Sequence, residues 1–158
     1  MTSVGDDVER PADDDASGGP EANGRLRPIV GLPVSVRARI VEWAADVAGG
    51  AAPRDLSPAL QKVARFAPAK RAQRAATVLA DAVQHDDRFR AMVAEHAAKL
   101  VVDGHPAADR PAAAARAVLL GSPDVDDLLA KVAAAQDQAD ARARVGELER
   151  ELRIMTAR

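Results

Sequence analysis

The residues of this chain that are best suited to a chemical role lie in one basic segment, residues 60–74. This segment carries five positive charges and no negative one, whereas the whole chain has 22 Lys and Arg against 24 Asp and Glu. Its cations are Lys62, Arg65, Lys70, Arg71 and Arg74. Lys and Arg side chains at this density neutralise phosphates, and the affinity that results falls steeply as salt rises. We therefore take these five residues as candidate nucleic-acid-binding residues.

Two predicted helices meet within the basic segment and position its cations. Ser57 and Pro58 are typical of a helix start, and this helix is expected to end near Phe66. Pro68 opens the next helix, whose first backbone N–H groups would offer an anion site beside the cations. We expect Phe66 to be buried, which leaves no aromatic side chain here to stack on bases. The alternative is a solvated face that balances the acidic residues of the chain or pairs with the last helix.

No other residues form a pattern that predicts catalysis or metal binding. The histidines are His85, His96 and His105. Their spacing does not put two of them side by side on one helix face, and a metal site needs converging ligands. The acidic pairs Asp86-Asp87 and Asp126-Asp127 each stand at a predicted helix start, where capping explains carboxylates. We therefore expect a protein that is not an enzyme, with no catalytic residue, metal, cofactor or small-molecule substrate.

The composition indicates a chain without disulfides or membrane spans. Cysteine is absent, and no stretch approaches the ~18 apolar residues of a membrane-spanning helix. Residues 1–28 are acidic and contain scattered Gly and Pro, so we expect a disordered tail that buries no core and is not a secretory signal. Much of the apolar fraction is alanine, which predicts a thin, closely packed core. We accordingly expect a cytoplasmic protein with no membrane contact.

Proline and glycine divide the remaining chain into helices, and strand-like alternation does not occur. The predicted fold class is all-α, with a small bundle of about five short helices over residues 29–121. Gly121 is expected to end the fifth of them. One long helix follows, over residues 122–158.

Individual bundle helices have clear predicted bounds. Pro33 opens the first, whose inner stripe contains Trp43. A single third helix is expected over residues 68–85. Asp86 and Asp87 are expected to cap the fourth helix, which should point Leu100 or Val101 inward near its end.

The long last helix carries two apolar patterns with heptad spacing. The first consists of Val125, Leu128, Val132, Ala135 and Ala139, and the second of Val145, Leu148, Leu152 and Met155. The second is shifted by one residue relative to the first, as in a coiled coil with a stammer. The spacing predicts a homodimer through residues 123–158, and the alternative is that the helix packs back on its own bundle. Because the second pattern is still running near the last residue, we also expect the helix to continue in a longer protein.

Three short motifs resemble the N-terminal region of a family of actinobacterial proteins. These motifs are Leu32–Arg39, the run Ala64–Ala72 with its Arg-Phe-Ala-Pro-Ala-Lys-Arg sequence, and Asp86–Arg90. The likeness covers about residues 29–155. Members of this family join a helical module and a coiled coil to a C-terminal NYN domain of the PIN-nuclease type, and they are described as predicted RNA-binding proteins.

The resemblance implies that this chain is the non-catalytic helical part of an RNA-binding protein. Nuclease activity would belong to an NYN domain absent from this chain, so no catalytic residue carries over. Two functions are then in competition. In the first, the basic segment contacts RNA while the last helix dimerises or links. In the second, the bundle is a protein-interaction or scaffolding module without nucleic-acid contact.

Overall fold

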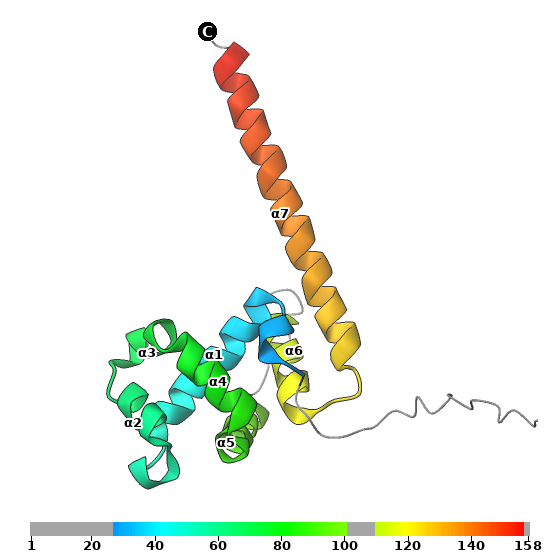
Figure 1. Cartoon of the computed structure of the whole chain (residues 1–158). Coiled ribbons are helices and arrows are strands. Elements are labelled where there is room, and N and C mark those ends of the chain that lie inside the picture. The colour runs from blue at the N-terminus through cyan, green and yellow to red at the C-terminus, as the bar shows by residue number, and fades with distance from the viewer. Residues whose placement is uncertain (1–26, 101–109, 157–158) are drawn as a thin grey trace, which may run out of the picture.

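In the computed structural model, residues 27–100 and 110–156 are described, and every regular element within them is helical. The predicted all-α class is therefore confirmed. The shorter helices gather into a bundle, and the last helix extends away from it as a rod (Figure 1). The expected acidic tail lies outside the described residues, apart from Arg27 and Pro28.

Seven α-helices and two 3-10 turns follow one another in the described part of the chain. They are η1 (Ile29–Gly31), α1 (Val34–Gly50), η2 (Pro53–Asp55), α2 (Pro58–Ala64), α3 (Pro68–Arg74), α4 (Ala76–His85), α5 (Asp87–Lys99), α6 (Arg110–Leu120) and α7 (Val125–Thr156).

Helix α1 forms the centre of the bundle, because α2, α3, α4, α5 and α6 all pack against it. Its buried face combines Val36, Ile40 and Trp43 with small residues such as Ala44 and Ala48. The expected burial of Trp43 is thus confirmed. The small side chains let neighbouring helices approach closely, and the buried face of α6 is likewise mostly alanine.

Gly121 ends α6 in the left-handed conformation, with a φ of 64°. The Ser122 N–H donates to the Ala117 carbonyl at 2.9 Å, and the Gly121 N–H donates to the Val118 carbonyl at 3.4 Å. This pair of bonds is the Schellman arrangement that glycine favours at a helix end. The predicted helix end at Gly121 is therefore confirmed, and it directs the chain into α7.

The prediction of a single helix over residues 68–85 is wrong, because the structure breaks this segment at Ala75. Ala75 has a φ of −118° and a ψ of 19°, and it separates α3 from α4. Alanine has no intrinsic tendency to break a helix, so packing overrides propensity at this position. The break lets Arg71 of α3 reach α1 and α2, while α4 buries Leu79 and Val83.

Some of the predicted helix starts and ends agree with the structure, and others do not. Asp86 caps α5 as expected, since its Oδ1 accepts a hydrogen bond from the Phe89 N–H at 2.9 Å. Ser57 occupies the N-cap position of α2, but its side chain makes no capping hydrogen bond. Of the two residues expected inward near the end of this helix, Leu100 is 37% exposed, because it lies just past the last turn of α5, and Val101 lies outside the described residues.

Only the first part of α7 packs on the bundle. Leu129 and Val132 are buried, and Val125 and Leu128 pack against the core from the same side. The first heptad pattern is therefore a bundle-packing face and not a free coiled-coil seam, with its last member, Ala139, exposed. From residue 137 to residue 156, α7 has no buried residue.

The difference between the two helix starts is testable. Replacing Asp86 with Ala removes the only side-chain cap of α5, so we expect the free energy of unfolding to fall by about 1 kcal/mol. Replacing Ser57 with Ala removes no capping bond and should change it by less than about 0.5 kcal/mol. Urea unfolding of both variants checks this, and equal losses would contradict the assignment of Asp86 as the functional cap.

Candidate nucleic-acid interface

The structure divides the five candidate cations into four on the surface and one in the interior. Lys62 and Arg65 stand three residues apart at the end of α2, and Lys70 and Arg74 stand four apart on α3. Each pair therefore lies on one side of its helix, and all four side chains are exposed. Arg71 is buried, with 8% of its surface accessible. Its expected role as a phosphate contact is corrected accordingly.

The guanidinium of Arg71 binds three backbone carbonyls from two other helical segments. Nη1 donates to the Ala45 carbonyl in α1 at 3.1 Å. Nη2 donates to the carbonyls of Ala64 at 3.2 Å and Phe66 at 3.1 Å, at the end of α2. One side chain of α3 thus connects α1, α2 and α3.

The two bonds at the end of α2 have a clear physical cause. The last carbonyls of an α-helix have no partner within the helix. No glycine follows α2 to form a C-terminal cap, because the residues at this end are Ala64, Arg65 and Phe66. The planar guanidinium of Arg71 supplies the missing donors from outside, and its positive charge suits the negative end of a helix.

The burial of Arg71 has a cost that its partners offset incompletely. Nε has no hydrogen-bond partner, and the acceptors of the other nitrogens are neutral carbonyls. A buried charge without a carboxylate partner is expensive. We conclude that the position of α3 depends on these carbonyl contacts, since loss of any one would leave the charge still less compensated.

Gly49 provides the space that the guanidinium occupies. A Cβ atom at Gly49 would collide with Nη1, Cζ and Nη2 of Arg71. A Cβ atom at the neighbouring Gly50 would meet nothing within 4 Å. Gly49 therefore has a packing role near the end of α1.

Phe66 is the second residue that differs from its prediction. It was expected to be buried, yet 38% of its surface is exposed, because the chain turns between α2 and α3 at this point. A partly exposed aromatic residue therefore stands between the two pairs of cations along the chain. We call Lys62, Arg65, Phe66, Lys70 and Arg74 the basic junction.

The sequence around the basic junction contains basic residues without acidic ones. Residues 56–80 contain no Asp or Glu. Within the described residues, none of the four exposed cations takes part in an ion pair. Helix α3 spans only seven residues, so its own dipole adds little, and the side chains carry the positive potential.

The acidic pairs and His85 have structural partners. Asp87 pairs with Arg90, Asp126 pairs with Arg27, and Asp127 pairs with Lys131 at 2.6 Å. The His85 Nδ1 lies 3.0 Å from Asp81 Oδ1 on α4. His105 lies outside the described residues, among which no group of three or more His, Asp or Glu side chains could hold a metal ion.

A perturbed carboxyl group also belongs to a helix surface. A hydrogen bond from Lys99 lowers the pKa of Glu95, four residues earlier on α5. This pair stabilises the helix and keeps the carboxylate ionised, which is the opposite of what a general acid needs.

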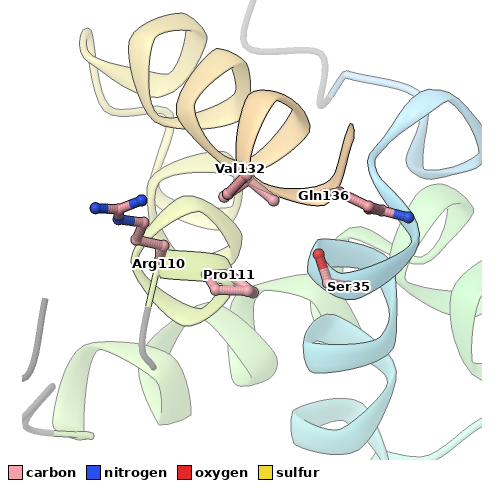
Figure 2. A pocket seen from close by; sticks show the side chains of 6 residues that line it. Ser35, Arg110, Pro111, Val132 and Gln136 are labelled. Atoms are coloured by element: carbon pink, nitrogen blue, oxygen red, sulfur yellow. The ribbon is translucent and has the colours of Figure 1, made fainter. Parts of the chain in front are cut away.

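Away from the basic junction, the described residues also line hollows, and we consider two of them. The larger is a mostly apolar groove of about 870 Å³ between η1 and α1 on one side and α3 and α4 on the other. The smaller, of about 260 Å³, lies where α7 crosses the starts of α1 and α6. In Figure 2, Val132 lies over Pro111 on one side of it, and Ser35 and Gln136 lie on the other. Ser35 has no histidine or carboxylate among the residues that line this hollow.

Comparison with known proteins adds no assignment. The chain matches no protein-family model, no curated protein and no solved structure. The resemblance to the helical region of NYN-domain proteins therefore remains an expectation from its motifs. In the described part of the chain, no helix is both long enough and apolar enough to span a bilayer.

The role of Gly49 in seating Arg71 can be tested against its neighbour. Replacing Gly49 with Ala should displace the guanidinium, leave carbonyls unpaired and lower the free energy of unfolding by about 2 kcal/mol. Replacing Gly50 with Ala should leave it unchanged or raise it by about 0.5 kcal/mol, because alanine reduces the conformational entropy of the unfolded chain. Urea unfolding measures both, and equal effects would refute the close packing of Gly49 on Arg71.

Proposed function

We propose that this bundle is a non-catalytic RNA-binding module that contacts single-stranded RNA through the basic junction. The observation that carries the proposal is the exposed ring of Phe66 among four exposed cations that have no ion-pair partner in the described residues. Because the chain as a whole has a net charge of −2, the positive potential is local, and RNA would bind at this end of the bundle.

The chemistry of the junction suits a flexible strand. Lys62, Arg65, Lys70 and Arg74 would contact successive phosphates, which supplies affinity without sequence preference. Phe66 would stack on an unpaired base, an interaction open to any base because every base has a π-face. A duplex keeps its bases stacked inside, so the ring favours single-stranded over double-stranded RNA.

Arg71 would act as a positioning residue in this mechanism. Its bonds to the carbonyls of Ala64 and Phe66 fix the turn on which Phe66 is displayed. They also hold α2 and α3 together, so the two pairs of cations keep a constant relation to the ring. RNA would find the surface already formed, which reduces the entropy lost on binding.

The phosphate contacts predict a specific salt dependence. Replacing Lys70 and Arg74 with Ala should weaken retention of a single-stranded RNA oligonucleotide about tenfold and flatten the slope of log K against log salt by about 1.4, because each phosphate contact contributes about 0.7. Replacing Arg150 and Arg153 with Ala changes the net charge equally on the exposed end of α7 and serves as the control. Mobility-shift titrations at several salt concentrations measure both. Equal behaviour of the two variants would reject the basic junction as the RNA site.

The stacking contact predicts a different signature. Replacing Phe66 with Leu keeps an apolar side chain but removes the aromatic face, so affinity should fall by about fivefold or more while the salt slope stays constant. Urea unfolding of the same variant controls for stability, which should change little because the ring is partly exposed. An unchanged affinity would remove Phe66 from the mechanism.

A protein-interaction module is the second candidate, and the groove between α1 and α3–α4 favours it. Val30 and Val34 line this groove, and they are 83% and 58% exposed. In that function the cations would serve solubility alone. The RNA titration separates the two candidates, since a scaffold of this kind would retain no RNA even at about 50 mM salt, where phosphate contacts are strong.

A further inference from the structure

The far end of α7 exposes an apolar stripe that its own bundle does not cover. Val145, Leu148, Leu152 and Met155 are between 55% and 66% exposed. They recur at alternating intervals of three and four residues, and Ala141 continues the series toward the bundle. We call Ala141, Val145, Leu148, Leu152 and Met155 the distal stripe. This spacing is that of a coiled-coil seam.

The distal stripe lies on the face of α7 opposite the bundle. An α-helix turns about 100° per residue, so Leu148 points about 160° away from Val132, which is buried against the bundle. Leu152 also points about 160° away from Val132, in the opposite sense of rotation about the helix axis. The stripe therefore cannot fold back onto the bundle of its own chain without a break in α7. A second helix placed on the stripe would meet no part of that bundle.

We propose that a second copy of this chain covers the distal stripe, in a parallel, in-register coiled coil. In heptad terms Val145 and Leu152 occupy a positions, and Ala141, Leu148 and Met155 occupy d positions. Each would pack on its own counterpart. The two bundles would then lie side by side at one end, each on the outer side of the paired helices.

The charges that flank the stripe complement a parallel partner. In such a dimer the g residue of one helix faces the e residue five positions later on the other. Asp137 would face the partner's Arg142, and Arg144 would face the partner's Glu149. Two-fold symmetry doubles both contacts, and all are attractive. Within the described residues, none of these four side chains makes an ion pair in its own chain.

Gln138 selects the parallel arrangement over the antiparallel one. It occupies the a position that precedes Ala141, and it is exposed. In the parallel dimer Gln138 meets its counterpart, and the two amides can hydrogen-bond. An antiparallel dimer that keeps Val145 opposite Leu148 would bury Gln138 against Met155 twice, which leaves a polar group unpaired. A matched polar layer of this kind is known to fix the register of coiled coils.

The apolar contact can be tested on the 158-residue chain by sedimentation equilibrium. We expect the unaltered chain to be a dimer, and replacement of Leu148 and Leu152 with Gln to make it a monomer at the same concentration. Replacement of Ala139 and Ala143 with Gln is the control, because both point away from the distal stripe on the same exposed helix. A monomeric unaltered chain, or equal loss of the dimer in the control, would overturn the proposal. Circular dichroism verifies that both variants keep α7.

Charge reversal tests the orientation. Replacing Arg144 with Glu, or Glu149 with Arg, turns two symmetric attractions into repulsions and should raise the dimer dissociation constant about tenfold. Combining the two replacements restores the attraction in a parallel dimer and should return the constant to near its original value.

An antiparallel dimer would respond to the double replacement in the opposite way. In that arrangement g faces g and e faces e. The carboxylate introduced at position 144 would then oppose the partner's Glu151, and the guanidinium introduced at position 149 would oppose the partner's Arg142. Dimerisation would be weaker than with either change alone, and this outcome would overturn the parallel arrangement.

Discussion

The hydrogen bonds from one buried guanidinium to three carbonyls determine the shape of the basic junction. Helices α2 and α3 have seven residues each, which is too short for either to be stable on its own. Arg71 ties both of them to α1, and Gly49 leaves the space that this requires. The surface that presents Phe66 and its neighbouring cations therefore depends on a charge that is itself hidden from solvent.

The basic residues of this segment thus occupy two different positions, one in the interior and four on the surface. Arg71 stabilises the turn from within, whereas Lys62, Arg65, Lys70 and Arg74 project from it. A Lys in place of Arg71 would carry the same charge but would lack the planar fork that reaches carbonyls on two sides. Charge alone does not separate the two groups, because all five residues are basic and lie within 13 positions of one another, from 62 to 74.

The sequence predicts those parts of the fold that depend on local chemistry. Proline at helix starts, Gly121 at the end of α6 and Asp86 at the start of α5 all act through neighbouring backbone groups, and all were predictable. The break at Ala75 and the exposure of Phe66 were not predicted. The break depends on packing between elements distant in sequence, such as the contact of Arg71 with α1, and Phe66 is exposed where the chain turns between α2 and α3. One signal for Arg71 was present: the end of α2 lacks a glycine, so its carbonyls needed a donor from elsewhere.

The two ends of α7 have different surroundings. Its first turns are anchored on α6, and the stretch from residue 137 to residue 156 stands clear of the bundle (Figure 1). At a rise of 1.5 Å per residue, this stretch is about 30 Å long. Anything fastened near Thr156 would be held about that far beyond the part of α7 that packs on α6. The exposed length of α7 would then set the distance between the bundle and whatever is attached at its far end.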